Sequence, residues 1–268
     1  MALIGASRNK QGLRLIQITD PHLGTEPGYR LAGIRTLESL AAIVAKVAES
    51  DLAPQGVIAS GDIAGHGEAK SYQAFDDQMA ALPCPYHWLP GNHDEPSVME
   101  RTLSVPFQLE LRFGNWLLLM LNSKQVNKVG GRISEEELLA ACTAALKHEG
   151  PVAVFVHHPP ISVNSEWIDA QQIENGEDML KRLADCGNVR AIFTGHVHQE
   201  FVGKSHGIDI YTAPSTCFQF AANSKEFAIG AGGPGYRWID LYEDGRIDTG
   251  VVMLETANQG LDRHCIGY

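Results

Sequence analysis

Short apolar or β-branched runs recur along the first two thirds of the chain, and each run ends in a polar loop. This texture predicts strands that are buried on one or both faces. The expected strands cover residues 14–20, 56–62, 86–92, 116–123, 152–159 and 191–196. Apolar residues at helical spacing between them predict helices over roughly 30–50, 68–81, 134–147 and 177–186. The order of these elements indicates an α/β core.

Two segments nearer the C-terminus have a different texture, typical of β-hairpins. They turn near His206-Gly207 and Asp244-Gly245, where glycine permits the backbone of a tight turn. We expect these hairpins, within residues 201–255, to form an antiparallel second sheet. The whole chain, 1–268, is expected to be a single domain, with its catalytic motifs in 13–200 and a tail at 256–268 that fits a lid, a dimer contact or a disordered segment.

The third expected helix carries a capping signal. Ser134 and Glu137 have the spacing of a capping box, in which the serine hydroxyl accepts a backbone N–H of the first turn. A helix start at this serine follows from that pattern.

Charge and cysteine content exclude several classes of function. The 268 residues include 21 basic and 32 acidic ones, a net charge of −11, which argues against a nucleic-acid or anionic-membrane surface. The five cysteines are widely spaced without a C-x-x-C pair, so neither a disulfide framework nor a thiolate zinc site is predicted. No apolar run is long enough to span a bilayer, and the N-terminus lacks a signal-peptide core. A cytoplasmic protein is expected.

Polar residues of one chemical type gather at five of the expected strand ends. They are Asp20 and His22 in "TDPHLG", Asp62 in "SGDIAG", Asn92 and His93 in "PGNHDEP", His157 and His158 in "FVHHPP", and His196 and His198 in "TGHVHQEF". Taken singly, each motif is ordinary turn chemistry or a core histidine. Ligands of α/β sheets gather beyond the carboxyl ends of the strands, however, and this is where the pattern places all five motifs.

The spacing within these motifs predicts a metal site. Side chains two apart in an extended segment point the same way, so Asp20 with His22, and His196 with His198, are each expected to converge. Glycine precedes a donor in three motifs, at Gly61, Gly91 and Gly195, and lets the backbone turn sharply beside crowded ligands. Seven oxygen or nitrogen donors exceed what one tetrahedral metal needs, but two metals that share one carboxylate would use them all. Imidazole and carboxylate ligands without sulfur suit Fe, Mn, Zn or Co and do not select among them.

The motifs follow one another along the chain as D-x-H, G-D, G-N-H-D/E, a later histidine and G-H-x-H. This order resembles the signature of the calcineurin-like metallophosphoesterases. Within that family the chain is most similar to bacterial class III cyclic nucleotide phosphodiesterases, on its size, its late histidine motifs and "TAPSTCFQF". The resemblance implies a four-layer α/β/β/α sandwich of two mixed β-sheets flanked by helices. It also implies a ligand set for each of two metals: Asp20, His22 and His198 for the first, Asn92, His157 and His196 for the second, with Asp62 as the bridge.

The implied reaction is hydrolysis of 3′,5′-cyclic AMP to 5′-AMP by a hydroxide that the metal pair activates. The alternative is a broader metallophosphoesterase that acts on glycerophosphodiesters, 2′,3′-cyclic nucleotides or phosphomonoesters. A non-catalytic binding scaffold would be expected to lack some of the ligands, and here all are present. The expected partner is a small phosphodiester, and a homodimer is an expectation from the family alone.

Residues beside the ligands receive further roles. His93 is the candidate general acid for the leaving group, because its neighbour Asn92 is assigned to a metal. Asp94 either orients the His93 imidazole, as a second catalytic residue, or has a plain turn role or caps the following helix. His158 either contacts the substrate or stiffens its loop. The expected substrate-binding residues are Asn92, His93, His158 and His198.

Three details of the sequence modify this prediction. Many family members carry Asp-Ser where this chain has Asn122-Ser123, which puts hydrogen bonding around the site in question. His66 is a candidate for the rim of the site, with an ordinary loop residue as the alternative. None of the five motifs contains Lys or Arg, so the metals are expected to supply most of the positive charge that faces a phosphate.

Overall fold

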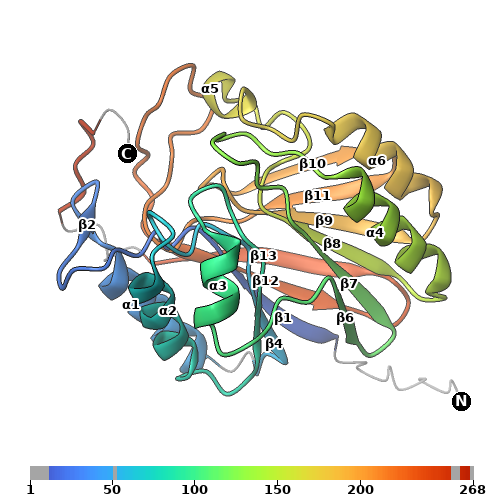
Figure 1. Cartoon of the computed structure of the whole chain (residues 1–268), viewed down its shortest axis with the longest axis horizontal. Helices are drawn as coiled ribbons and strands as arrows, with labels where there is room; N and C mark the ends of the chain where they lie inside the picture. Colours follow the sequence, from blue (N-terminus) through green and yellow to red (C-terminus); the bar gives the residue numbers. More distant parts are fainter. Residues whose placement is uncertain (1–11, 51–52, 255–259, 266–268) are drawn as a thin grey trace, which may run out of the picture.

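Two β-sheets pack face to face, and helices cover both outer faces (Figure 1). The computed structural model describes residues 12–50, 53–254 and 260–265. One sheet has five strands in the order β13-β12-β1-β4-β5, and the other has six in the order β10-β11-β9-β8-β7-β6. Helices α1, α2 and α3 lie on the side of the first sheet, and α4 and α6 lie on the side of the second. The predicted α/β/β/α sandwich is therefore confirmed.

Parallel strands form the centre of each sheet. In the five-stranded sheet the parallel strands are β1 (Leu13–Ile18), β4 (Gly56–Ala59) and β5 (Tyr86–Trp88). In the six-stranded sheet they are β7 (Trp116–Leu121), β8 (Val152–Val156), β9 (Val189–Thr194) and β11 (Ile208–Thr212). The antiparallel strands are β6 (Glu110–Phe113), β10 (Phe201–Ser205), β12 (Gly235–Leu241) and β13 (Ile247–Met253).

Three of the helices, α2, α4 and α6, begin within one residue of the positions that the sequence indicates. The helices are α1 (Thr36–Ala48), α2 (Ala69–Met79), α3 (Pro96–Thr102), α4 (Glu135–Lys147), α5 (Glu166–Asp169) and α6 (Gly176–Asp185). At the start of α4 the Ser134 hydroxyl accepts the Glu137 N–H at 3.1 Å, as the capping signal predicts. The Glu137 carboxylate accepts the backbone N–H of Asn122 at 2.6 Å, so it ties this helix to the end of β7.

The structure corrects the prediction of a separate antiparallel second sheet. Both predicted hairpins form, but β10-β11 extends the six-stranded sheet beside β9, and β12-β13 extends the five-stranded sheet beside β1. An open edge of a parallel sheet presents unpaired backbone groups, and each hairpin pairs one such edge. The hairpins therefore enlarge the two sheets that carry the site.

A second correction concerns the helix expected over residues 30–50. Its first part is a small hairpin, β2 (Arg30–Leu31) with β3 (Ile34–Arg35), which turns at Ala32-Gly33 with positive φ at both residues. The helix itself begins at Thr36. Leu37, near the start of this helix, is 44% exposed.

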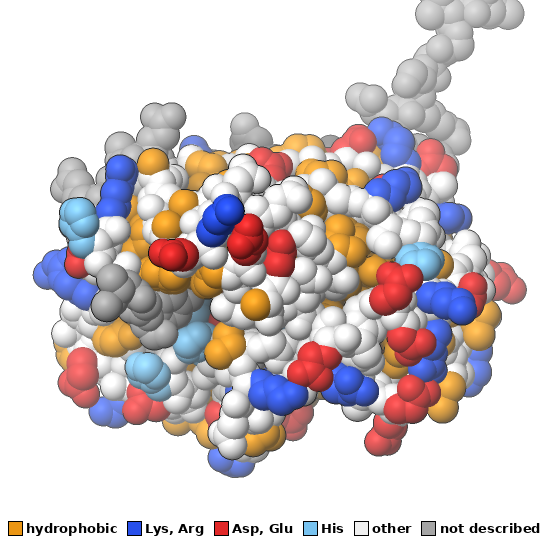
Figure 2. Space-filling view, turned by 90° about the horizontal axis from the view of Figure 1, so that it is seen from above, with side chains coloured by type: hydrophobic (Ala, Val, Ile, Leu, Met, Phe, Trp, Pro, Cys, Tyr) orange, Lys and Arg blue, Asp and Glu red, His pale blue; other side chains and the backbone are white. Residues whose placement is uncertain are grey.

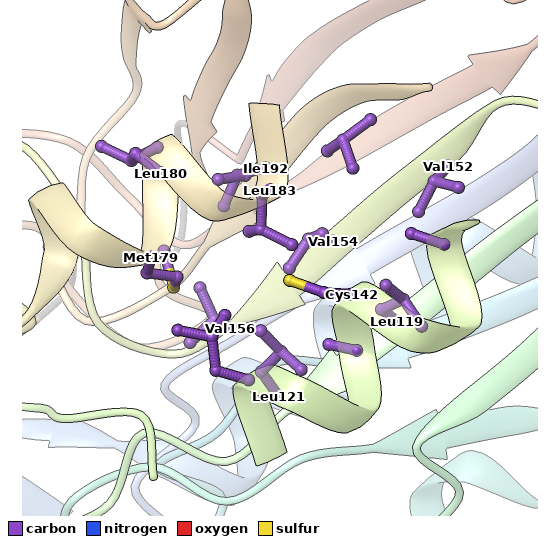
Figure 3. Close-up of a cluster of buried hydrophobic side chains, with 14 of the residues drawn as sticks. Leu119, Leu121, Cys142, Val152, Val154, Val156, Met179, Leu180, Leu183 and Ile192 are labelled. Atoms are coloured by element: carbon purple, nitrogen blue, oxygen red, sulfur yellow. The ribbon is translucent and has the colours of Figure 1, made fainter. Parts of the chain in front are cut away.

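Three apolar layers follow from alternation along strands that are buried on both faces. In β8, Val152, Val154 and Val156 point toward α4 and α6, where Figure 3 shows them packed with Cys142 and Leu183. Ala153 and Phe155 of the same strand belong to the layer between the two sheets. Full burial of one such side chain stabilises the fold by about 1.5–3 kcal/mol. The continuous apolar runs of the sequence are thus explained by two covered faces.

The parallel strands end at the same edge of the sandwich. The carboxyl ends of β1, β4 and β5 meet those of β8 and β9, so the loops that follow these strands face one another. Along residues 12–50, 53–254 and 260–265, no helix combines the length and apolar character needed to cross a membrane. Cys84, Cys142, Cys186 and Cys217 are free thiols, in agreement with the absence of a predicted disulfide framework.

The predicted tail is only partly described, because residues 255–259 and 266–268 lie outside the described residues. In the described part, the Asp262 backbone N–H donates to the Ala32 carbonyl at 2.9 Å, and Leu261 packs beside the buried core that includes Leu31. This part of the tail therefore rests on the β2-β3 hairpin.

Candidate metal centre

Five loops bring the seven predicted ligands together at the carboxyl ends of the strands. Asp20 and His22 follow β1, Asp62 follows β4, Asn92 follows β5, His157 follows β8, and His196 and His198 follow β9. All are buried except Asn92, which is half-buried. Backbone hydrogen bonds of 3.0 Å join neighbouring loops, from Asp20 to Gly61 and from His22 to Asp62. The ligands are thus held by the sheet and by the loops themselves.

The first predicted ligand group forms a compact cluster. His22 Nε2 lies 3.2 Å from His198 Nε2, and His198 Nε2 lies 3.2 Å from Asp20 Oδ1. The Phe218 carbonyl, 2.9 Å from His198 Nδ1, can only accept a hydrogen bond, so Nδ1 carries the proton. The unprotonated Nε2 therefore faces the other two ligands, the orientation that metal-binding histidines adopt.

The second predicted group lies next to the first and has Asp62 between them. Asp62 Oδ2 is 3.2 Å from His157 Nε2 and 3.8 Å from His22 Nε2. His157 Nε2 is also 3.2 Å from Asn92 Oδ1, while its Nδ1 donates to the Ser60 carbonyl at 2.8 Å. His196 Nε2 is buried and has no hydrogen-bond partner among the described residues. Such an orphaned donor atom fits a metal ligand, because an unpaired buried polar atom is costly.

The ligand loops have an unusual backbone. Asp20, His22, Asp62, His196 and His198 all have positive φ, between 44° and 65°. A non-glycine residue in this region costs on the order of 1–3 kcal/mol and persists where the surrounding structure enforces it. The expectation that the paired ligands converge because their segments are extended is therefore wrong. They converge because each residue turns through the left-handed region.

Glycine relieves crowding beside the ligands, as the sequence indicates. A Cβ at Gly91 would lie 2.2 Å from Asp62 Oδ1, and one at Gly195 would lie 2.1 Å from Thr19 Oγ1. Gly61 also has φ +98° and faces the His157 ring, with 2.5 Å between its ideal Cβ and Nδ1. Of the three glycines, only Gly61 is required for a turn, and all three are required for close approach.

Burial and neighbouring charges together set the protonation of the centre. Burial lowers the pKa of His157, but Asp62 and Asp20 outweigh it and raise that pKa to about 9. Burial also lowers the pKa of His22 to about 3, and burial together with His158 holds the pKa of His196 well below its usual value. Burial raises the pKa of Asp62, but the imidazoles of His157 and His93 outweigh it and hold that pKa well below the usual range. Neutral imidazole and ionised carboxylate are the forms that bind metals. The donor set, with no thiolate, fits the borderline and hard metals that the sequence indicates.

Comparison with known proteins agrees with this geometry. The sequence model of the calcineurin-like phosphoesterase family matches residues 13–200, the part that carries all seven ligands. The chain belongs to the calcineurin-like phosphoesterases. The family resemblance drawn from the motifs is therefore confirmed, and membership implies a site for divalent metals.

Several proteins similar to this chain are bacterial and are named as cyclic nucleotide phosphodiesterases. The chain is 34% identical over 258 residues to the 3′,5′-cyclic adenosine monophosphate phosphodiesterase CpdA of Pseudomonas aeruginosa, covering 95% of this chain and 94% of that protein. It is 33% identical over 249 residues to a 3′,5′-cyclic-nucleotide phosphodiesterase of Nostoc, covering 91% and 94%. A dimetal phosphatase of Danio rerio superposes with a TM-score of 0.61 at 16% identity, over 91% of this chain and 99% of that one, which shows the fold alone.

In this phosphoesterase, His93 stands beside the metal ligands and is half-buried. Its Nδ1 lies 2.9 Å from the Gly65 carbonyl, its backbone N–H donates to Asp62 Oδ1 at 2.8 Å, and its ring centroid is 4.9 Å from that of His22. Since the carbonyl only accepts, Nδ1 carries a proton. The partner that orients the imidazole is therefore the Gly65 carbonyl, where the sequence analysis had proposed the Asp94 carboxylate.

Asp94 joins two loops of the centre. Its buried carboxylate accepts hydrogen bonds from the backbone N–H groups of Ile63, Ala64 and Gly91 at 2.9–3.2 Å and from the Tyr72 hydroxyl at 3.1 Å. The helix-cap alternative is wrong, because the N-cap of α3 is Glu95. Asp94 thus holds the loop after β4 against the loop after β5.

His158 is held on both sides by the segment that follows β7. Its Nδ1 is 2.7 Å from the Ser123 hydroxyl and its Nε2 is 2.8 Å from the Val129 carbonyl. Burial together with His157 lowers its pKa to about 3, so it is neutral. His158 could join a cluster with His157 and His196, but both of its ring nitrogens are engaged. The geometry supports the structural alternative for His158.

The Asn122-Ser123 departure leaves these contacts intact. Ser123 bonds His158, while the Asn122 side chain accepts the backbone N–H of Lys124 at 3.0 Å. Asn122 therefore shapes the start of the loop that carries Lys124.

A cleft of about 480 Å³ lies over the ligands. Its floor includes Asp62, Asn92, His93 and His196, whereas His158 and His198 are fully buried behind it. Figure 2 shows histidine side chains in a recess of one face, next to hydrophobic ones, with acidic and basic side chains interspersed around it. His66 is exposed and is not among the described residues that line the cleft.

The walls of this cleft include Lys124 and Lys128 on one segment, and Trp167, Phe220 and Phe227 on two others. Phe220 lies in the segment "TAPSTCFQF", which the family resemblance already uses. No motif marks the other four residues, because their loops have no fixed spacing from the ligands. The lysines add positive charge to a site where the metals were expected to supply most of it.

Proposed function

We propose that this phosphoesterase hydrolyses 3′,5′-cyclic AMP to 5′-AMP with two metal ions. The observation that carries the proposal is the pair of ligand groups that share Asp62 at the floor of a cleft, with His93 beside them. Two relatives that align over more than nine tenths of the chain are named as cyclic nucleotide phosphodiesterases, which supports this substrate class.

The two groups divide the ligands between the metals. The first ion would be held by Asp20, His22 and His198. The second would be held by Asn92, His157 and His196, and Asp62 would bind both ions. When bound, such a pair polarises a phosphoryl oxygen and supplies a hydroxide nucleophile near neutral pH. The metal is one of Fe, Mn, Zn or Co, since no ligand of the set selects among them.

The protein's own residues contribute orientation and proton transfer. The leaving 3′ oxygen of the ribose is a poor leaving group, and His93 is the general acid that protonates it. Nδ1 of His93 stays on the Gly65 carbonyl, so Nε2 is the nitrogen that exchanges the proton with the substrate. Asn92 and His93 both line the cleft and bind the phosphodiester, while Asp94 positions their loop. A homodimer and a cytoplasmic location remain predictions.

The test is a substrate panel on metal-analysed protein. It includes 3′,5′-cyclic AMP, 2′,3′-cyclic AMP, a glycerophosphodiester and an aryl phosphomonoester, each with and without a chelator. We expect two metals per chain and the highest kcat/KM on 3′,5′-cyclic AMP. His198→Ala protein, purified in the same way, controls for contaminating esterases. If the protein hydrolyses another ester but not 3′,5′-cyclic AMP, the proposal is wrong and the broader phosphoesterase activity replaces it.

A further inference from the structure

Three aromatic rings pack together on one wall of the cleft. The ring centroids of Trp167 and Phe220 are 4.7 Å apart, those of Trp167 and Phe227 are 5.3 Å apart, and those of Phe220 and Phe227 are 5.6 Å apart, all edge to face. Phe220 is only 5% exposed, whereas Trp167 and Phe227 are half-buried. Part of the apolar surface of Trp167 and Phe227 therefore stays open to the cleft.

The backbone holds this aromatic cluster in place. Phe220 and Phe227 lie on a narrow loop that the Ala221 N–H closes by donating to the Ala228 carbonyl at 2.7 Å. The Ser224 N–H donates to the Ser165 hydroxyl at 3.3 Å, which ties this loop to the start of the helix that carries Trp167. Two segments far apart in the sequence thus build one wall.

The aromatic cluster is also tied to the metal ligands. The Phe220 ring stacks on the His198 imidazole with centroids 4.2 Å apart and an interplanar angle of 16°, and the Phe220 N–H donates to the His198 carbonyl at 3.2 Å. Any group that contacts Trp167 and Phe227 from the cleft is therefore at a fixed position relative to the ligands.

The opposite wall has a different chemistry. Lys124 donates to the Asn92 carbonyl at 2.6 Å, and Lys128 lies 2.6 Å from a Glu174 carboxylate oxygen. An ammonium group has three donors, so each lysine keeps donors for a ligand. Among the described residues that line the cleft, Asp62 alone is acidic. The cleft thus joins an aromatic wall, a basic wall and a phosphate-binding floor.

We propose that Trp167 and Phe227 form a nucleobase-binding subsite, on which the base of the substrate stacks while its phosphate lies on the floor. This inference rests on the proposed function and names the residues that select its substrate. A cleft of about 480 Å³ is in the range of sites that hold small organic ligands. Stacking of a base on an aromatic side chain changes affinity by roughly 5- to 150-fold. A glycerol group has no flat face to stack on these rings.

The experiment compares two cyclic diesters that share the reacting phosphate. One is 3′,5′-cyclic AMP, and the other is methyl riboside 3′,5′-cyclic phosphate, which has no base. Trp167→Leu removes the flat ring at similar polarity, and Trp167→Phe restores one; Phe227→Leu and Phe227→Tyr form the matching pair. Metal content and thermal unfolding are measured for each variant.

We expect wild-type kcat/KM to be about 10-fold or more higher for the nucleotide, through KM. Trp167→Leu should lower kcat/KM for 3′,5′-cyclic AMP by about 10-fold and leave the base-free diester nearly unchanged, and Trp167→Phe should recover most of the loss. Equal wild-type constants for the two diesters, or equal losses on both in the leucine variants, would overturn the subsite.

The failure of the proposed function has a different signature. In that case the wild-type protein turns over neither cyclic diester but hydrolyses another ester. The subsite is then tested with 5′-AMP and ribose 5-phosphate as competitive inhibitors of that reaction. Tighter inhibition by 5′-AMP, lost in Trp167→Leu, supports a base subsite, and equal inhibition overturns it.

Discussion

The Nε2 atoms of His22 and His198 lie 3.2 Å apart, although 176 residues separate them in the chain. Two nitrogen lone pairs at this distance repel each other unless a cation lies between them or one nitrogen is protonated. Burial lowers the pKa of His22 to about 3, so its imidazole is neutral and can present Nε2 as a lone pair. Asp20 and Asp62 add negative charge on the same side. The pair is thus arranged for a metal ion.

Metal removal should therefore destabilise the fold. At a free metal concentration of 100 Kd, binding stabilises the native state by about 2.7 kcal/mol, and chelation should lower Tm by roughly 5–10 °C. Calorimetry with and without a chelator measures the shift.

His198→Ala should bind one metal fewer and lose at least about 100-fold in kcat, whereas the exposed His66→Ala should match wild type. Two metals bound to His198→Ala would contradict the ligand assignment.

His93→Ala should act on the leaving group. We expect a loss of about 10²–10⁴-fold on 3′,5′-cyclic AMP, whose alkoxide needs a proton, and a much smaller loss on an aryl diester. The metal content should stay at the wild-type value, since His93 is assigned to no metal. Steady-state kinetics on both esters measure the difference. Equal losses on the two esters would remove the general-acid role.

Asp94→Ala should chiefly affect stability. It leaves three backbone N–H groups and the Tyr72 hydroxyl without their acceptor, and each unsatisfied buried group costs about 1–3 kcal/mol. We expect the free energy of unfolding in urea to fall by about 4 kcal/mol or more, and by about 1–3 kcal/mol in Tyr72→Phe, which removes one of these bonds and the acceptor of the Glu95 N–H. Unchanged stability together with a new leaving-group dependence would instead favour direct action on His93.

The seven candidate metal ligands could be selected from the sequence, and the structure brings them together, but the reason for their convergence could not be predicted. Short motifs at strand ends reveal the donors, because the parallel order of the strands brings those ends together. The left-handed backbone of Asp20 and His198 is invisible in such motifs. It is imposed by bonds to loops that are distant in the sequence, such as the one from the Asp20 N–H to the Gly61 carbonyl.

The way in which the walls of the cleft come together could not be predicted from the sequence, for a related reason. Trp167 and Phe227 meet only because Ser165 and Ser224 join their segments. Lys124 reaches Asn92 from a loop whose path depends on His158 and Ser123. Neither relationship follows from spacing or periodicity. The sheet that each of the two C-terminal hairpins joins could not be predicted either, because each hairpin pairs with a strand outside itself, β9 or β1.

Lys124→Met should weaken the metal group that contains Asn92. The Lys124 ammonium donates to the Asn92 carbonyl at 2.6 Å and so fixes the backbone that presents the Asn92 amide. Loss of such a supporting contact typically lowers metal affinity by about 10–100-fold. Metal titration followed by calorimetry measures it. Lys128→Met removes an exposed lysine of the same loop, paired with Glu174, and should leave the affinity unchanged. Equal effects of the two substitutions would contradict the role of Lys124.

The free energy of unfolding should depend on pH through Glu137, whose carboxylate joins α4 to the end of β7. Burial raises its pKa from about 4.5 to about 7, although its carboxylate accepts the Asn122 N–H. The folded chain then binds this proton more tightly than the unfolded chain, so the stability contributed by the protonated group is fully present below pH 4.5 and is lost as pH rises toward 7.

Glu137→Gln keeps an acceptor for Asn122 and removes the titration. The unfolding free energy of wild type relative to this variant should fall by on the order of 1–2 kcal/mol from pH 4.5 to pH 8, after allowance for the part of the carboxylate that water reaches. Urea unfolding at four pH values in this interval measures the difference. Glu136→Gln, exposed on the same turn of α4, is the matched control and should give a flat difference. A flat difference for Glu137→Gln would show that the carboxylate titrates at the same pH in the folded and unfolded chains.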